Sequence, residues 1–411
     1  MKKLGRIPLL LLVILLLSTA SSLAAPSRVW VMTGPNTSEY NVVKTIADRW
    51  NALHPDKQVD VQMSAGSEDV LKVAIVAGQA PDIYTAMASG PYVGFAKDGF
   101  LTNFNELPGF NDLIAARSFG PIITDYTYAG QNFVIPWQTE VLLYEYNIDM
   151  LNNIGVGKFP SCYSDFYGVC DKLTQFKRGC IELHLNTTWN ERIADYYLHY
   201  LAASGGRTLI ERRRATFNSP VGIATLQFLV EAYRRSYPLD DVIGGDLFIS
   251  GYMLTKRWGQ AATSQFNEAG FNWGAAPAPV PDDYSGPQPP YTFMNMKHIV
   301  MPFNAKNQQN AWAFLKFMLE PENDRILLDS GRFPVRTDLG THRAFADWFR
   351  KNPQGLQFAN HIGRARDLDQ IANLVEIYEA FSEHFINAIL GRIAPHIALE
   401  QAADAVNRLV F

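Results

Sequence analysis

The chain has 411 residues, more than the roughly 250–300 that one hydrophobic core usually holds, so we expect two lobes or domains. Apolar residues make up 47% and charged residues 18%, a composition that excludes a disordered or collagen-like chain. With 36 basic and 40 acidic residues the formal charge is −4, so nothing in the composition favours a nucleic-acid partner.

The N-terminus has the pattern of a secretory signal peptide. Basic residues precede an unbroken apolar run over 9–17, and small residues lead to Ala24-Ala25. As a helix this run spans about 14 Å, whereas a bilayer core needs roughly 30 Å, so a membrane anchor is not favoured. We expect cleavage after Ala24, which makes 1–24 the signal peptide. No Cys follows, so no lipid anchor is expected, and the periplasm is the default destination.

Export permits disulfides, and three cysteines lie close together at Cys162, Cys170 and Cys180. Three thiols cannot all pair within one chain, and their spacing is not that of a zinc site. One bridge among them is compatible with the sequence; burial of the thiols as small apolar groups is the favoured alternative.

Strands and helices alternate over the first part of the mature chain. Residues 28–32, 59–63 and 82–85 read as strands, and helices begin at Ser38 and Ser67 between them. The apolar faces expected to pack on the sheet are Val43, Ile46, Ala47, Trp50 and Leu53 in the first helix, and Val70, Val73, Ala74 and Ala77 in the second. This order predicts an α/β fold with a parallel sheet covered by helices.

The middle of the chain repeats the pattern with different parts. Strand-like runs flank Ala129-Gly130, and a further strand covers 141–146. A helix over 163–177 precedes a strand over 180–185, and a longer helix ends near Ser204. A helix starting at Pro220 is expected to bury Ile223, Leu226, Val230 and Tyr233, and 277–290 reads as an exposed loop.

The last part is mostly helical, interrupted at 332–336. Two apolar stripes predict buried helix faces: Ala311, Phe314, Leu315 and Met318 in one helix, and Leu399, Ala402, Ala403, Val406 and Val410 in another.

Catalytic motifs are absent from the sequence. It contains no G-x-S-x-G, no H-E-x-x-H and no phosphate-binding loop, and its His residues are scattered, so no metal or cofactor is expected. The adjacent acids Asp240-Asp241 and Asp282-Asp283 read as solvated loop residues. Glycosidase carboxylates carry no sequence signature, so an enzyme is not excluded, but the pattern favours binding.

Several short motifs, in order along the mature chain, resemble those of the bacterial extracellular solute-binding proteins of carbohydrate ABC importers, the group that includes maltose-binding protein. They are 78–83, 99–101, 128–131 with 143–147, 217–220, 311–317 and 331–336. The resemblance implies the two-lobed periplasmic-binding (type II) fold, each lobe a mostly parallel sheet flanked by helices, with three hinge crossings. It divides the chain into one lobe of 25–136 plus 293–336 and another of 137–292 plus 337–411.

The same resemblance implies a monomeric receptor that captures a sugar between its lobes and delivers it to ABC-transporter permease subunits. A sugar offers hydroxyls and flat C–H faces, so its cleft needs aromatic planes and fixed polar groups. Resemblance and residue chemistry together give the candidate ligand residues as Thr33, Asn36, Ser89, Trp137, Thr139, Glu140, Trp273, Asn295, Arg336 and Tyr378. Trp137 and Glu140 are preferred, because packing alone poorly explains a Trp and a carboxylate beside a hinge proline.

Each candidate has a structural alternative. Trp273 and Tyr378 suit a hydrophobic core, and Arg336 suits an ion pair with an acid at the surface. Two alternative functions also stay open: a binding protein for another solute, such as a glycerol phosphodiester or a polyamine, and an exported glycoside hydrolase.

Overall fold

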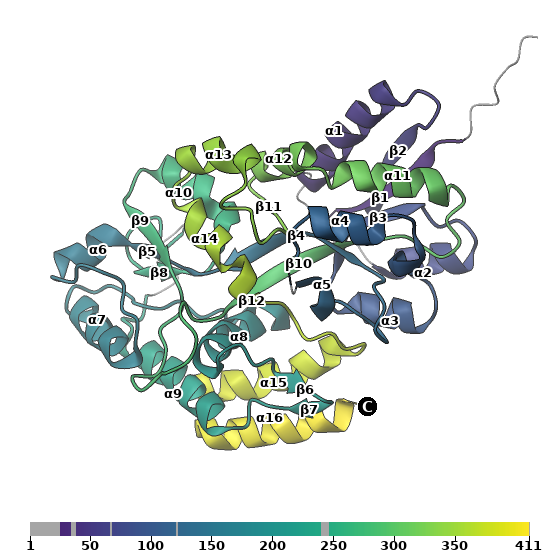
Figure 1. The fold of residues 1–411 in the computed structure, drawn as a ribbon. Helices are drawn as coiled ribbons and strands as arrows, with labels where there is room; N and C mark the ends of the chain where they lie inside the picture. Colours follow the sequence, from purple (N-terminus) through teal and green to yellow (C-terminus); the bar gives the residue numbers. More distant parts are fainter. Residues whose placement is uncertain (1–24, 34–37, 66–67, 121, 240–245, 411) are drawn as a thin grey trace, which may run out of the picture.

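The computed structural model describes residues 25–33, 38–65, 68–120, 122–239 and 246–410. The predicted signal peptide, the helix start at Ser67, Asn36 and Asp240-Asp241 lie outside them. The molecule is an elongated α/β protein of two lobes, with strands crossing between them (Figure 1).

A seven-stranded sheet organises the N-terminal lobe. Its strands are β1 (Ser27–Thr33), β2 (Val59–Ala65), β3 (Ile83–Ala88), β4 (Ile135–Leu142), β10 (Thr292–Val300), β11 (Phe333–Pro334) and β12 (Ala365–Arg366). The order is β11-β4-β10-β3-β1-β2, with β12 beside β10. The predicted parallel core is confirmed, because β1 pairs in parallel with both β2 and β3, whereas β10 runs antiparallel to β3 and β4.

Helices cover this sheet. They are α1 (Ser38–Leu53), α2 (Glu68–Val76), α3 (Pro91–Lys97), α4 (Phe110–Ala116), α5 (Ile122–Asp125), α11 (Gln308–Met318), α12 (Pro321–Asp329), α13 (Ala346–Lys351) and α14 (Gly355–His361). The predicted face of α1 is buried except at Leu53, which lies exposed in its last turn. The predicted face of α2 is right only at Ala74: Leu71 and Ile75 are the other buried residues, and Val73 is 69% exposed.

Two long strands connect the lobes. β4 and β10 lie side by side and antiparallel: β4 leaves the N-terminal lobe for the second lobe, β10 returns, and the chain crosses a third time after β12 (Figure 1). Because the hydrogen-bonded pair β4–β10 belongs to the large sheet, its side chains are positioned by a continuous ladder and not by a loop.

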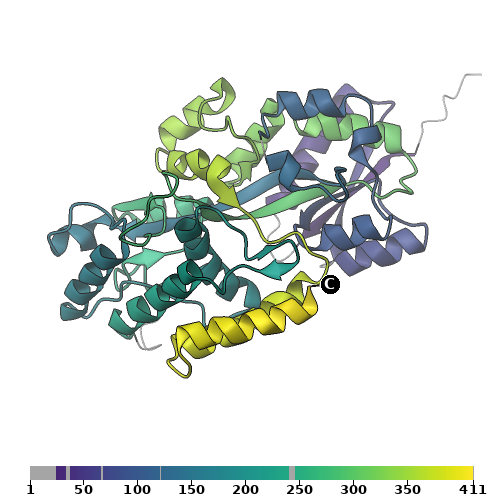
Figure 2. The ribbon, with the colours of Figure 1, turned by 60° about the horizontal axis from the view of Figure 1, so that its bottom comes forward.

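The second lobe contains short strands and long helices. A three-stranded sheet joins β8 (Thr255–Lys256), β5 (Tyr144–Asn147) and β9 (Trp273–Ala276), and β6 (Ile210–Glu211) and β7 (Arg214–Ala215) form a hairpin. The helices are α6 (Ile148–Asn153), α7 (Tyr163–Gln175), α8 (Trp189–Ser204), α9 (Pro220–Arg235), α10 (Thr263–Ala269), α15 (Leu374–Ile389) and α16 (Pro395–Leu409). The two C-terminal helices lie together along the second lobe (Figure 2), and the predicted stripes of α11 and α16 are both buried.

Three predictions for the second lobe differ from the structure. Its sheet is antiparallel where a mostly parallel one was predicted; parallel contacts there are isolated bridges such as Gly179–Met253. The predicted strand 180–185 does not form, because side chains hold this segment: Ser236 accepts from the Cys180 amide and Thr255 donates to its carbonyl. The buried face of α9 is also rotated, so that Tyr233 is exposed.

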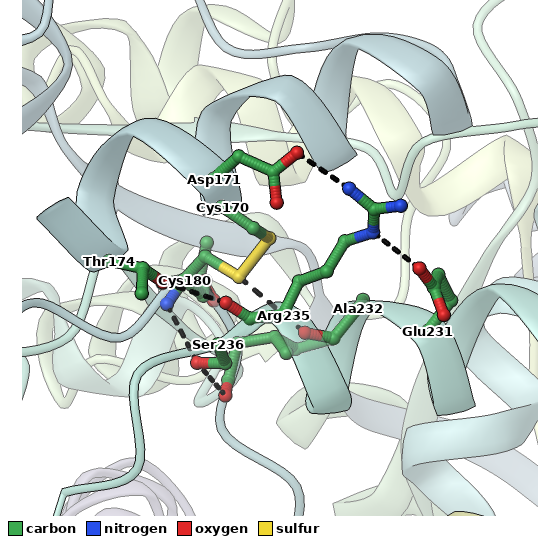
Figure 3. The surroundings of a disulfide bond; sticks show 10 residues. Cys170, Asp171, Thr174, Cys180, Glu231, Ala232, Arg235 and Ser236 are labelled. Carbon is green, nitrogen blue, oxygen red and sulfur yellow. Dashed lines mark hydrogen bonds and ion pairs between the residues drawn. A yellow bond between two sulfur atoms is a disulfide. The ribbon is translucent and has the colours of Figure 1, made fainter.

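A disulfide joins Cys170 of α7 to Cys180, so the favoured alternative of buried thiols is wrong for this pair, and Cys162 is free. Figure 3 shows the bridge beside the end of α9, where Arg235 pairs with Asp171 at 2.6 Å and with Glu231 at 2.5 Å. The Arg235–Asp171 pair fastens α9 to α7 next to the covalent link, and the Arg235–Glu231 pair lies within α9 and orients the guanidinium. In the described part of the chain, no helix combines the length and apolar character needed to cross a bilayer.

Candidate functional site

The pairing of β4 with β10 decides which side chains share a face. Glu140 lies opposite Asn295, and Gln138 lies opposite Lys297. Because side chains alternate along a strand, these four point to one face of the crossing, and Trp137 points to the other together with Thr139.

The opposite face is a packed core. Trp137 is 1% exposed and belongs to the main hydrophobic cluster, and Thr139 is buried beside it. The argument that packing poorly explains a Trp at this position is therefore wrong, whereas Glu140 lies only partly buried on the polar face. We leave Trp137 and Thr139 out of the ligand site.

Charged side chains from both lobes surround Glu140. Glu39 at the start of α1 accepts a hydrogen bond from Gln138 and pairs with Arg332 at 3.4 Å. Burial raises the pKa of Glu140, and Arg332 followed by Lys297 works in the opposite direction. The second lobe contributes Glu191, at the first turn of α8, whose negative charge raises this pKa further.

Two acceptors in this group lack donors. Among the described residues the Glu140 carboxylate receives no hydrogen bond, and the buried Oε1 of Gln138 has no partner either. An unsatisfied buried acceptor costs about 1–3 kcal/mol, so the Gln138 oxygen favours a ligand that supplies hydroxyl or amine hydrogens. The partly exposed Glu140 carboxylate beside it can accept from the same groups. The arrangement can therefore bind a polar ligand between the lobes.

A loop of the second lobe closes against Glu140. Both oxygens of buried Glu145 accept from the loop, one from the Trp258 amide at 3.0 Å and one from the Gly259 amide at 2.7 Å. Gly259 has φ +86°, and a Cβ there would come within 2.9 Å of Glu140 Cγ, so the loop approaches this closely because residue 259 is glycine.

The loop presents an aromatic ring that sequence reasoning missed. Trp258 is 41% exposed, and the Lys256 ammonium lies 5.0 Å from its ring centroid. A half-exposed Trp held one residue from the glycine at Glu140 is a suitable stacking plane for a sugar ring. In the sequence its sole signal is a Trp before a glycine, which identifies a site only once Glu145 and Glu140 are known to meet there.

Arg257, the preceding residue, anchors the loop in the second lobe. Its Nε donates to Asp195 at 2.9 Å and its Nη2 to Glu191 at 2.9 Å. Desolvation opposes ionisation of Asp195, but Arg257 and then His184 outweigh it and hold the pKa of Asp195 below its usual value. Glu191 and Trp258 are thereby positioned by the same guanidinium.

Three other predicted residues lie inside the protein. Ser89 is buried and its Oγ contacts His298 Nε2 at 2.8 Å; Trp273 is buried and donates to Asn267; Tyr378 is buried and donates to Asp369 at 2.7 Å. The side chain of Thr33, at the end of β1, is not described, and Asn36 lies outside the described residues.

Arg336 is committed to an internal ion-pair network. Its Nε donates to Asp338 at 2.8 Å, its Nη1 lies 3.4 Å from Asp324, and the residue is 1% exposed. Asp324 also accepts from Arg117 at 2.7 Å. The alternative of an ion pair is thus confirmed, with partly exposed Asp338 and buried Asp324 as the partners. Arg336 is therefore left out of the ligand site with Ser89, Trp273 and Tyr378.

Comparison with known proteins identifies the family. The chain matches the family model of bacterial extracellular solute-binding proteins over residues 45–355. It belongs to that family. A maltotriose-binding protein of Pyrococcus abyssi (strain GE5 / Orsay) is 24% identical over 319 residues, covering 76% of this chain and 66% of the relative. The chain thus spans slightly less than two thirds of that relative's length.

Solved structures share the fold of this solute-binding protein. An uncharacterised protein from Listeria monocytogenes EGD-e has a TM-score of 0.85 at 21% identity, covering 94% of this chain and 100% of its own. The cyclic alpha-maltosyl-1,6-maltose binding protein of Arthrobacter globiformis scores 0.81 at 20% identity, covering 94% and 98%. The sugar-binding protein of Xanthomonas citri scores 0.79 at 17% identity, covering 94% and 97%. The predicted two-lobed fold is confirmed.

Proposed function

We propose that the protein is an exported receptor that captures a sugar or oligosaccharide between its lobes and delivers it to an ABC importer. The observation that carries the proposal is the pair of acceptors Glu140 and Gln138 on one face of the crossing, with a second-lobe loop against Glu140 in which half-exposed Trp258 precedes Gly259. A sugar matches this set, because its hydroxyls donate to carboxylate and amide oxygens while its C–H face stacks on indole. The maltotriose-binding relative supports the same ligand class.

The remaining parts of the proposal rest on the N-terminal sequence pattern and on the family. We infer that the mature chain starts at Ala25, acts as a monomer without a lipid anchor, contacts permease subunits at the membrane and performs no turnover. The lobe boundaries belong to this proposal: 136 and 293 are kept, and the last one moves from the expected 336 to the crossing after β12, because 345–365 pack with the N-terminal core. Asn295, as a further ligand contact beside Glu140, is also part of it.

A thermal-shift screen of the mature protein tests the ligand class. The panel contains mono- and oligosaccharides including maltotriose, glycerol phosphodiesters and polyamines. A ligand at 100 times its dissociation constant stabilises the folded state by about 2.7 kcal/mol. Stabilisation by one sugar class, recovered chemically unchanged, supports the receptor; stabilisation by a charged solute alone refutes the sugar assignment, and release of shortened products refutes the absence of turnover.

Paired substitutions test the site. Glu140→Gln should weaken sugar binding at least tenfold, because hydrogen bonds to a charged acceptor contribute about 1.5–3 kcal/mol. Trp258→Ala should weaken it by about tenfold through loss of stacking. Glu383→Gln and Tyr233→Ala, at exposed positions elsewhere in the second lobe, serve as controls in isothermal titration calorimetry. Wild-type affinity in both cleft variants would refute the assigned site.

A further inference from the structure

A cavity of about 450 Å³, named the rear cavity, lies beside Met294 of β10. Both lobes and the third crossing line it: the N-terminal lobe contributes Asp125, the second lobe contributes Arg212-Arg213 at the tip of the β6–β7 hairpin, and the crossing contributes the segment that starts at Arg366. A molecule bound there would contact both lobes at once. Its volume falls in the roughly 300–1,000 Å³ range of small-molecule sites.

This rear cavity is separate from the site at Glu140. Met294 of β10 lines the cavity, whereas the next residue, Asn295, pairs with Glu140. Consecutive residues of a strand point to opposite faces, so the two sites lie on opposite faces of the crossing.

The hairpin supplies unpaired positive charge. Arg212 and Arg213 are exposed, and neither forms an ion pair or side-chain hydrogen bond among the described residues. Their φ values are +49° and +61°, a backbone region in which such hairpin turns strongly prefer Asn-Gly. Each non-glycine residue in this conformation costs about 1 kcal/mol or more. The chain thus places two arginines at the cavity where the backbone disfavours them.

Two acids of the rear cavity, Asp367 and Asp369, are buried and already accept hydrogen bonds from tyrosine hydroxyls. Asp367 Oδ2 accepts from Tyr126 at 3.0 Å, and Asp369 accepts from Tyr378 at 2.7 Å. Burial raises the pKa of Asp367 to about 6 and that of Asp369 to about 7, which reduces their negative charge further.

At the rim, Arg366 is balanced by a neighbouring acid. It lies 3.9 Å from Asp125, and its guanidinium stacks 4.8 Å from the Tyr291 ring centroid. The charge left without a partner at the rear cavity is therefore the pair of guanidinium groups at the hairpin tip.

We propose that the rear cavity is a second binding site, for a small polyanion carrying carboxylate or phosphate groups, and that its occupant changes the affinity of the cleft. Guanidinium groups bind both anion types through paired N–H donors. A ligand that touches both lobes binds one lobe arrangement better than another, and this differential affinity couples it to any ligand whose binding depends on that arrangement. The coupling rests on the proposed function of the cleft; anion binding does not.

The test uses the mature protein at low salt with three probes: citrate, pyrophosphate and inorganic phosphate, with sodium chloride matching ionic strength. Isothermal titration calorimetry should give saturable binding of citrate or pyrophosphate to the wild type and at least tenfold weaker binding to R212Q/R213Q. The matched control is K158Q/R408Q, which removes two exposed cations from other parts of the second lobe. Because both altered pairs are exposed, equal melting temperatures without anion show that each variant is folded.

The second readout is the maltotriose titration with and without saturating probe. In the wild type the probe should change the maltotriose dissociation constant at least threefold, and in R212Q/R213Q it should leave it unchanged. Citrate binding without pyrophosphate binding would assign a carboxylate ligand, and the reverse a phosphorylated one. Equal binding to R212Q/R213Q and K158Q/R408Q overturns the anion site, and an unchanged maltotriose constant overturns the coupling. If no sugar binds, the proposed function fails while the anion titration still decides the rear cavity.

Discussion

Removing the disulfide should destabilise the protein by an amount set by the loop that it closes. Cys170 and Cys180 are ten residues apart, and both are buried. In the chain-entropy model a loop of this length restricts the unfolded chain by about 9 cal/mol/K, or about 2.7 kcal/mol at 25 °C. For a chain of this size that corresponds to a fall of about 3 °C in melting temperature. The perturbation is the double substitution Cys170→Ala/Cys180→Ala, measured by urea titration of the mature protein.

Two comparisons isolate the loop entropy. The wild-type protein titrated in the presence of reductant keeps both sulfur atoms, so it loses the constraint without leaving a cavity. Cys162→Ala removes a thiol that is not bridged and should leave the free energy of unfolding nearly unchanged. If the reduced protein unfolds with the same free energy as the oxidised protein, to within about 0.5 kcal/mol, the unfolded-state argument is wrong. Non-covalent contacts such as the Arg235–Asp171 ion pair would then suffice to hold α7 against α9.

Buried and strained groups elsewhere give three more expectations. Asp324→Ala leaves the buried Arg117 guanidinium without its carboxylate, so the free energy of unfolding, measured by urea titration, should fall by about 3–5 kcal/mol. The control Asp48→Ala removes an exposed ion pair and should cost less than about 1 kcal/mol; equal losses would contradict the argument. The folded chain keeps the Asp369 proton up to about pH 7 and the unfolded chain releases it near pH 4. Stability should therefore fall between these values, by at most about 1.4 kcal/mol per pH unit, with a smaller slope in Asp369→Asn; identical slopes would count against the assignment. R212N/R213G relieves the hairpin turn and should raise the free energy of unfolding by about 1 kcal/mol while removing the citrate response; a lower value would show that the turn is not strained.

The spacing of apolar residues predicted helices and strands correctly where a single face of the element packs against the core. The stripes of α11 and α16 and the strands β1, β2 and β3 were all predictable, because their apolar spacing matches the geometry of a single buried face. The face of α2 was not, because Val73 and Leu71 are both apolar and only the neighbouring elements decide which is covered.

The site was predictable only in part. Glu140 could be proposed from its position beside the hinge. That Trp137 points to the opposite face depends on the strand register, which the sequence does not give: a register shifted by one residue exchanges the two faces. Trp258 could not be found, because its exposure results from Glu145 holding the loop more than a hundred residues away in sequence. Arg336 was misjudged because its buried partner Asp324 lies on α12, and only the packing of that helix brings the two side chains together.

Because side chains alternate along β4, the exposure of Glu140 to the cleft and the burial of Trp137 in the core depend on the same strand register. Glu140 and Trp137 are kept apart by the parity of a strand, so deleting or inserting a single residue between 137 and 140 would put both on one face, with either the indole in water or the carboxylate in the core. Loop 277–290 has no such parity to preserve, since its backbone pairs with no strand over most of its length. Insertions and deletions among related proteins should therefore be found in loop 277–290 and not in β4, whatever ligand each protein binds.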